Sequence, residues 1–111
     1  MFIVTGPAGG GKATFVRSVC ASRTLVTIDG PTVGATEAIA AAVVGLVEYD
    51  DEVVVIEPYY DSYVAAVAMA GATRRAARLV RSGGHIRLDV DSLRDAFSPR
   101  TRAVLVNTPH N

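Results

Sequence analysis

The chain has 111 residues, of which 50% are hydrophobic, and its 11 basic and 11 acidic side chains leave no net charge. This length fits one small domain, and the balanced charge gives no support for a site that binds nucleic acid or another polyanion. Cys20 is the single cysteine, which excludes an internal disulfide, and no apolar run approaches the roughly 18 residues of a membrane span. We therefore expect a cytoplasmic protein without a nucleic-acid or membrane partner.

Residues 1–31 predict a strand, a glycine-rich loop, a helix and a second strand. Phe2–Thr5 is a short apolar run, and Ala13–Ala21 places apolar side chains at helical spacing. Leu25–Ile28 is a second run rich in β-branched residues, and the turn sequence Asp-Gly-Pro closes it. We treat these residues as one segment of the chain and residues 32–111 as another.

Residues 32–111 predict alternating helices and strands. An alanine-rich helix with Glu37 in its first turn precedes an uninterrupted β-branched run, which is typical of a strand covered on both faces in a parallel sheet. Asp89 has the position of an N-cap. The predicted elements are a helix over 36–47, a strand over 53–56, a helix over 59–70, a short edge strand over 75–80, a helix from 89 to about 97 and a strand over 103–106. This alternation predicts an α/β fold.

The nonapeptide GPAGGGKAT near the N-terminus is the first candidate site. Gly6, Gly11 and Lys12 have the spacing of a phosphate-binding loop and lie between a predicted strand and a predicted helix. Ala13 stands where that motif has a magnesium-binding hydroxyl, and Thr14 points about 100° further round the helix. The segment resembles the P-loop NTPases in part. Two interpretations stay open: a glycine-rich turn with a solvated lysine, or a nucleotide site made by Gly6, Gly11, Lys12 and Thr14.

A second and longer resemblance runs from Thr32 to Asn111. Three motifs carry it in a fixed order: VGATEAI at 33–39, DEVVVIEPYYDSY at 51–63 and NTPHN at 107–111. In these motifs the segment resembles the class I/II aminotransferases that use pyridoxal phosphate, and among them the kynurenine, methionine and succinyldiaminopimelate aminotransferases. The resemblance implies a fragment of the large domain of a fold-type I pyridoxal-phosphate enzyme, with a partial three-layer sandwich.

The resemblance also implies a cofactor site. In the family, the start of a helix binds the cofactor phosphate, an aromatic ring stacks on the pyridine ring, and two asparagines bond the phenolic oxygen and the substrate carboxylate side. The matching cofactor-binding residues are Gly34, Ala35, Thr36, Tyr60, Asn107 and Asn111. The implied small-molecule partners are an amino acid and a 2-oxo acid, and the implied assembly is a homodimer.

The catalytic lysine is missing from this pattern. Transamination needs a lysine that holds the cofactor as a Schiff base and moves a proton. The single lysine, Lys12, lies outside the aminotransferase-like segment. We therefore expect a truncated aminotransferase that has no catalytic residue of its own and is inactive alone. Two alternatives stay open: a small P-loop nucleotide-binding protein and a non-catalytic accessory fragment.

The remaining polar residues predict no metal site. Asp89, Asp91 and Asp95 cluster around the start of a predicted helix, where capping and solvation explain them. His85 and His110 have no carboxylate or cysteine at metal-ligand spacing. The sequence therefore gives no reason to expect a bound metal.

Overall fold

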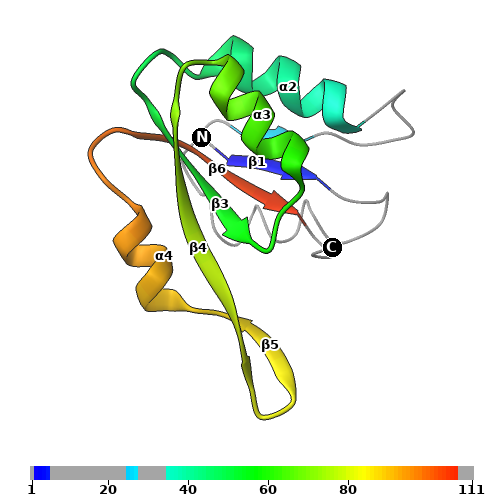
Figure 1. Cartoon of the computed structure of the whole chain (residues 1–111), viewed down its shortest axis with the longest axis vertical. Coiled ribbons are helices and arrows are strands. Elements are labelled where there is room, and N and C mark those ends of the chain that lie inside the picture. Colours follow the sequence, from blue (N-terminus) through cyan, green and yellow to red (C-terminus); the bar gives the residue numbers. More distant parts are fainter. Residues whose placement is uncertain (1, 6–24, 28–34, 108–111) are drawn as a thin grey trace.

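The computed structural model describes residues 2–5, 25–27 and 35–107. In these residues six strands form one sheet in the order β2-β1-β6-β3-β4-β5, and helices pack on both of its faces (Figure 1). The elements are β1 (Phe2–Thr5), β2 (Leu25–Thr27), α2 (Ala35–Leu46), β3 (Glu52–Glu57), α3 (Asp61–Met69), β4 (Thr73–Ser82), β5 (His85–Leu88), α4 (Val90–Ala96) and β6 (Thr101–Asn107).

All neighbouring strands of the sheet run parallel except the last pair. β1 lies between β2 and β6, and β6 lies between β1 and β3, so the final strand occupies the middle of the sheet. β4 pairs in parallel with β3 and antiparallel with β5. Because β1, β6 and β3 are parallel neighbours, they end at the same edge, which we call the carboxyl edge; the opposite one is the amino edge.

The central strands are apolar because helices cover both faces of the sheet. α2 and α3 cover one face with a core that contains Ile39, Val43, Val53, Val55, Tyr63, Ala66, Val67, Ala103 and Leu105. α4 covers the other face, where the buried cluster is Val54, Ala77, Ala96, Val104 and Val106. This arrangement confirms the predicted α/β fold and the partial three-layer sandwich. None of the helices in the described ranges is long and apolar enough to cross a membrane.

Most of the predicted elements are present with small shifts at their ends. The strands predicted over 53–56 and 103–106 each extend further in both directions, and Asp89 caps α4 by accepting hydrogen bonds from the N–H groups of Asp91 and Ser92, both at 3.2 Å. α3 begins at Asp61, two residues later than predicted. The helix predicted over 13–21 lies outside the described residues. β1 and β2 join the same sheet as the later strands, and the division of the chain at residue 31 stays a prediction.

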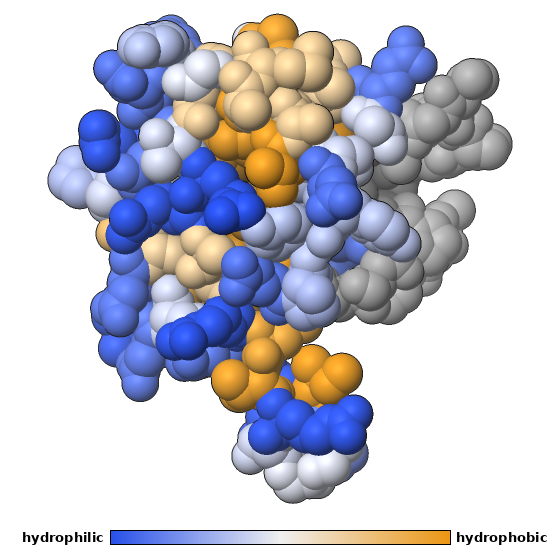
Figure 2. All heavy atoms as spheres, in the orientation of Figure 1, coloured by the Kyte–Doolittle hydropathy of each residue, from blue (hydrophilic) through white to orange (hydrophobic). Residues whose placement is uncertain are grey.

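The strand predicted over 75–80 is present as β4, but it is longer than predicted and lies between β3 and β5 instead of at the edge of the sheet. β4 has 10 residues, and β5, which was not predicted, pairs with its end through a tight turn. Gly83 and Gly84 form that turn with φ of 58° and 79°, the left-handed conformation that two-residue hairpins require. The hairpin projects from the rest of the molecule (Figure 1), and Figure 2 shows apolar and hydrophilic side chains close together on it. Val80 and Ile86 are its exposed apolar residues.

The end of α3 depends on a glycine in the left-handed conformation. The N–H of Gly71 donates to the carbonyl of Ala68 at 3.0 Å and that of Ala72 to Val67 at 3.1 Å, which is the Schellman pattern. Gly71 has a φ of 69°, and a Cβ atom at this position would lie 2.6 Å from Cδ2 of Tyr49. Both the backbone conformation and the lack of space therefore require glycine.

We expect Gly71→Ala to lower the free energy of unfolding by at least about 1–2 kcal/mol, the cost of a left-handed residue with a Cβ. Gly45→Ala is the matched control, because Gly45 lies inside α2 and a Cβ there meets nothing within 4 Å. That change should raise the free energy of unfolding by roughly 0.5–1 kcal/mol. Urea unfolding followed by circular dichroism measures both changes. If the free energy of unfolding changed in the same direction in the two variants, the expectation would be contradicted.

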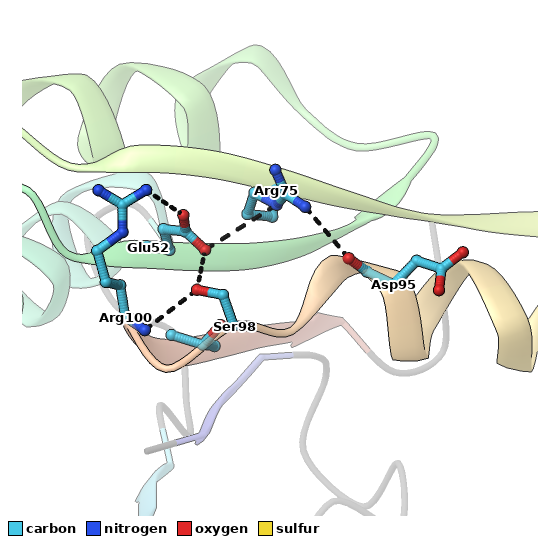
Figure 3. Close-up of polar contacts among 6 residues, drawn as sticks. Glu52, Arg75, Asp95, Ser98 and Arg100 are labelled. Carbon is cyan, nitrogen blue, oxygen red and sulfur yellow. Dashed lines mark hydrogen bonds and ion pairs between the residues drawn. The ribbon is translucent and has the colours of Figure 1, made fainter.

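A buried carboxylate ties the amino edge together (Figure 3). Glu52 begins β3 and is 3% exposed. Its carboxylate accepts hydrogen bonds from Ser98 Oγ at 2.6 Å and Arg100 Nη2 at 2.9 Å, and Arg75 Nε lies 4.0 Å away. Arg75 Nη2 also donates to the carbonyl of Asp95 at 3.2 Å. The cluster therefore connects β3 and β4 to the end of α4 and the loop before β6.

Candidate functional site

The carboxyl edge brings together the ends of three strands. β1 ends at Thr5 and β6 at Asn107, and these two residues are partners in the parallel register. β3 ends beside them at Glu57, which is followed by a cis peptide bond to Pro58. Ligands of open parallel sheets bind outside the carboxyl ends of the strands, so this edge is the candidate site.

α2 directs its N-terminus toward the same edge. The chain leaves the C-terminal end of α2 to begin β3 at the amino edge, and in Figure 1 the first turn of α2 lies on the side toward which β1 and β6 point. Ala35 and Thr36 are its first residues, and the Thr36 side chain is exposed. The first N–H groups of a helix have no partner within the helix and lie at its positive end, so they can bind a phosphate.

Tyr60 occupies the junction between β3 and α3. It is the N-cap of α3, with extended backbone angles, and its carbonyl accepts a hydrogen bond from the N–H of Tyr63 at 3.0 Å. Its ring is 6.0 Å from the ring of Tyr63 in an edge-to-face arrangement, and Tyr63 is buried in the core. Tyr60 itself is 52% exposed. A ring supported in this way keeps surface available for a flat ligand.

An open recess of about 430 Å³ adjoins the linker that ends at Tyr60. Its walls come from the end of β3, the middle of β4 and the linker between β3 and α3. The lining residues are Glu57, Pro58, Tyr59, Arg78 and Leu79. Glu57 and Arg78 are partners in the β3–β4 register, so the recess carries one negative and one positive side chain.

The structure places three of the predicted site positions at the carboxyl edge. The first is the start of α2, where Ala35 and Thr36 lie; the second is Tyr60; the third is Asn107, which is partly buried. Their role as cofactor ligands stays a prediction. The other predicted positions lie outside the described residues: Gly34 and Asn111 of the cofactor site, and Gly6, Gly11, Lys12 and Thr14 of the alternative nucleotide site.

The sequence prediction missed the partner of Tyr59. Arg74 Nη1 donates a hydrogen bond to the Tyr59 hydroxyl, and the guanidinium carbon of Arg74 lies 5.2 Å from the centre of the Tyr59 ring. The two residues are 15 positions apart, and their contact depends on the pairing of β3 with β4. The tandem tyrosines were visible in the sequence, but no local pattern identified Arg74.

The described residues contain no group of three or more histidine, cysteine, aspartate or glutamate side chains that could hold a metal ion. Of the two histidines, His85 is exposed at the start of β5, and His110 lies outside the described ranges. The aspartates around the start of α4 act as the N-cap and as the partner of an exposed arginine: Asp91 pairs with Arg94 at 3.1 Å.

Comparison with known proteins identifies the family. Residues 30–111 match the family model described as aminotransferase class I and II. The solved structure of N-succinyldiaminopimelate aminotransferase from Mycobacterium tuberculosis is 52% identical and superposes with a TM-score of 0.68. The match covers 95% of this chain and 29% of that one. The likeness therefore extends over most of residues 1–31 as well as over the segment from residue 32 onward.

Two further relatives belong to the group that the sequence predicted. Methionine aminotransferase of Escherichia coli is 44% identical over 80 residues, which is 72% of this chain and 20% of the relative. Kynurenine–oxoglutarate transaminase 3 of Bos taurus is 39% identical over 88 residues, again 72% of this chain and 19% of the relative. The chain spans 28% of the length of the curated relatives from M. tuberculosis. It belongs to the class I and II aminotransferase family, as its motifs predicted.

Proposed function

We propose that this chain provides the phosphate-binding and ring-stacking side of a pyridoxal-phosphate site in an aminotransferase, an enzyme that moves an amino group from an amino acid to a 2-oxo acid. One observation carries the proposal. The start of α2, the half-exposed ring of Tyr60 and the amide of Asn107 belong to elements that meet at the carboxyl edge of the parallel strands β1, β6 and β3. A cytoplasmic location and a homodimeric assembly belong to the same proposal.

The chemistry of these residues fits the cofactor. The N–H groups of Ala35 and Thr36 suit a phosphate, the ring of Tyr60 suits a pyridine ring, and the amide of Asn107 suits an oxygen on that ring. Pyridoxal phosphate is the cofactor of this family, and when bound it stabilises negative charge on the substrate carbon. In the proposal, the residues of this chain bind and orient the cofactor.

The lysine content limits what the chain does by itself. Lys12 is the single lysine in the sequence and lies outside residues 30–111, the part that matches the family model. A Schiff base with the cofactor requires a lysine amine. We therefore propose that the 111-residue chain binds pyridoxal phosphate without a covalent bond and does not catalyse transamination alone.

Equilibrium dialysis of the chain against pyridoxal phosphate tests the proposal. Saturable binding is expected, with inorganic phosphate as a competitor. Tyr60→Ala should raise the dissociation constant roughly 2- to 10-fold, because aromatic stacking contributes about 0.5–1.5 kcal/mol. Tyr49→Ala is the matched control, since Tyr49 is 79% exposed and follows α2 at the amino edge. An equal loss of affinity for pyridoxal phosphate in the two variants, or no saturable binding by the unmodified chain, would refute the proposed site.

A further inference from the structure

Tyr59 precedes Tyr60, the proposed stacking residue, and its side chain is held by Arg74, which lies near the opposite edge of the sheet. Arg74 lies opposite Val53 near the amino edge, whereas Tyr59 follows Glu57 at the carboxyl edge. For the contact with Arg74 to form, the Tyr59 side chain has to lie back along β4. Ala76, whose side chain is a single methyl group, lies between Arg74 and Arg78 on that face of the strand.

The contact between Arg74 and Tyr59 has two parts that act together. The guanidinium donates to the Tyr59 hydroxyl, and its carbon is 5.2 Å from the ring centre. A cation at this distance from an aromatic ring is attracted by the ring's quadrupole. Tyr59 also packs against the core on the α2–α3 face. The side chain is therefore fixed at its tip by Arg74 and along its ring by the core.

Tyr60 is consequently held from both sides. Tyr59 precedes it and is fixed by Arg74, and Tyr63 follows it with a buried ring and an N–H that donates to the Tyr60 carbonyl at 3.0 Å. The Tyr60 side chain makes no capping hydrogen bond at the start of α3, so no bond of that kind sets the direction of its ring. The direction of the ring is therefore set by its edge-to-face contact with Tyr63 on one side and by the position of Tyr59 on the other.

We propose that Arg74 is a positioning residue for Tyr60: by holding Tyr59 against β4, it fixes the linker between β3 and α3 and thereby the direction of the Tyr60 ring at the carboxyl edge. What the ring binds rests on the proposed function. The positioning itself does not, so the two can be tested separately in the same variants.

The central variant is Arg74→Met, which keeps most of the side-chain length and removes both the charge and the donor. Arg81→Met is the matched control, because Arg81 is an exposed arginine of β4 that lies outside the recess and makes neither contact with Tyr59. Tyr59→Phe removes only the hydroxyl, and Arg74→Lys keeps the charge without the planar fork of donors. Arg74 is exposed, so these variants should fold, and their unfolding midpoints check this.

The first measurement is amide hydrogen exchange at Tyr63, whose N–H donates to Tyr60. Arg74→Met should speed this exchange roughly 2- to 5-fold, the range that one exposed cation–π contact supports, with a smaller effect for Arg74→Lys. Arg81→Met should leave the exchange at Tyr63 unchanged. Equal exchange in Arg74→Met and Arg81→Met, at equal unfolding midpoints, would overturn the proposal.

The second measurement is the dissociation constant for pyridoxal phosphate. It should rise by a similar factor in Arg74→Met, rise less in Tyr59→Phe, which keeps the ring under the Arg74 cation, and stay constant in Arg81→Met. If the unmodified chain binds no pyridoxal phosphate, the proposed function fails while the exchange measurement still decides the positioning role. If the cofactor binds but Arg74→Met changes neither its affinity nor the exchange at Tyr63, the proposed function stands and the role of Arg74 is refuted.

Discussion

Leu105→Ala should lower the free energy of unfolding by about 2–5 kcal/mol, the usual cost of removing a large side chain from a packed core. Leu105 is 1% exposed and lies on β6, where its partners are Ile3 of β1 and Val55 of β3. It belongs to the core between the sheet and the helices α2 and α3. A cavity at this position therefore affects both neighbouring strands and the helix layer at once.

Urea unfolding followed by tyrosine fluorescence measures this loss, since the chain has no tryptophan. Ile86→Ala is the control: it removes a β-branched side chain from β5 that is 66% exposed, and its effect should stay within about 0.5 kcal/mol. A loss for Leu105→Ala no larger than that for Ile86→Ala would contradict the central position of β6.

The strands at the centre of the sheet were predictable because burial on both faces imposes a simple pattern. Val53–Ile56 and Ala103–Val106 are continuous apolar runs, and few other environments tolerate such runs in a small domain. β5 lacks this pattern, since all its residues except Leu88 are exposed and it has only four residues. Its one signal was the Gly83-Gly84 pair, which is typical of a hairpin when the flanking residues can pair.

The candidate site was predictable only where its residues lie within motifs. Thr36, Tyr60 and Asn107 each belong to a short string that resembles the family, and each is found at the carboxyl edge. The contact of Arg74 with Tyr59 depends on the β3–β4 register, which the sequence does not specify. The same limit applies to Glu52, whose hydrogen-bond partners lie 46 and 48 positions away in the loop before β6.

Glu52 should make the stability of the chain depend on acid pH. The hydrogen bond from Ser98 holds the pKa of the Glu52 carboxyl below its ordinary value of 4.5, against the opposing effect of burial, and Arg100 and Arg75 lower it further. A carboxyl group whose pKa is lower in the folded chain than in the unfolded chain stabilises the fold at pH values above the unfolded pKa. That stabilisation is lost as the pH falls through the lower, folded value. Unfolding midpoints should therefore fall progressively below about pH 4.5.

Glu52→Gln separates the charge from the shape of this side chain. At pH 7 the variant should be clearly less stable than the unmodified chain, because Arg100 and Arg75 lose a buried partner. The difference should begin to narrow as the pH falls below about 4.5, and it should close as the pH passes the lower, folded pKa of Glu52, where the carboxyl of the folded chain also loses its charge. Asp91→Asn is the control for a surface pair, since Asp91 and Arg94 are 87% and 74% exposed, and it should change stability little at pH 7. A stability difference for Glu52→Gln that stays constant from pH 7 to pH 3 would show that shape and packing, and not the carboxylate charge, hold the amino edge together.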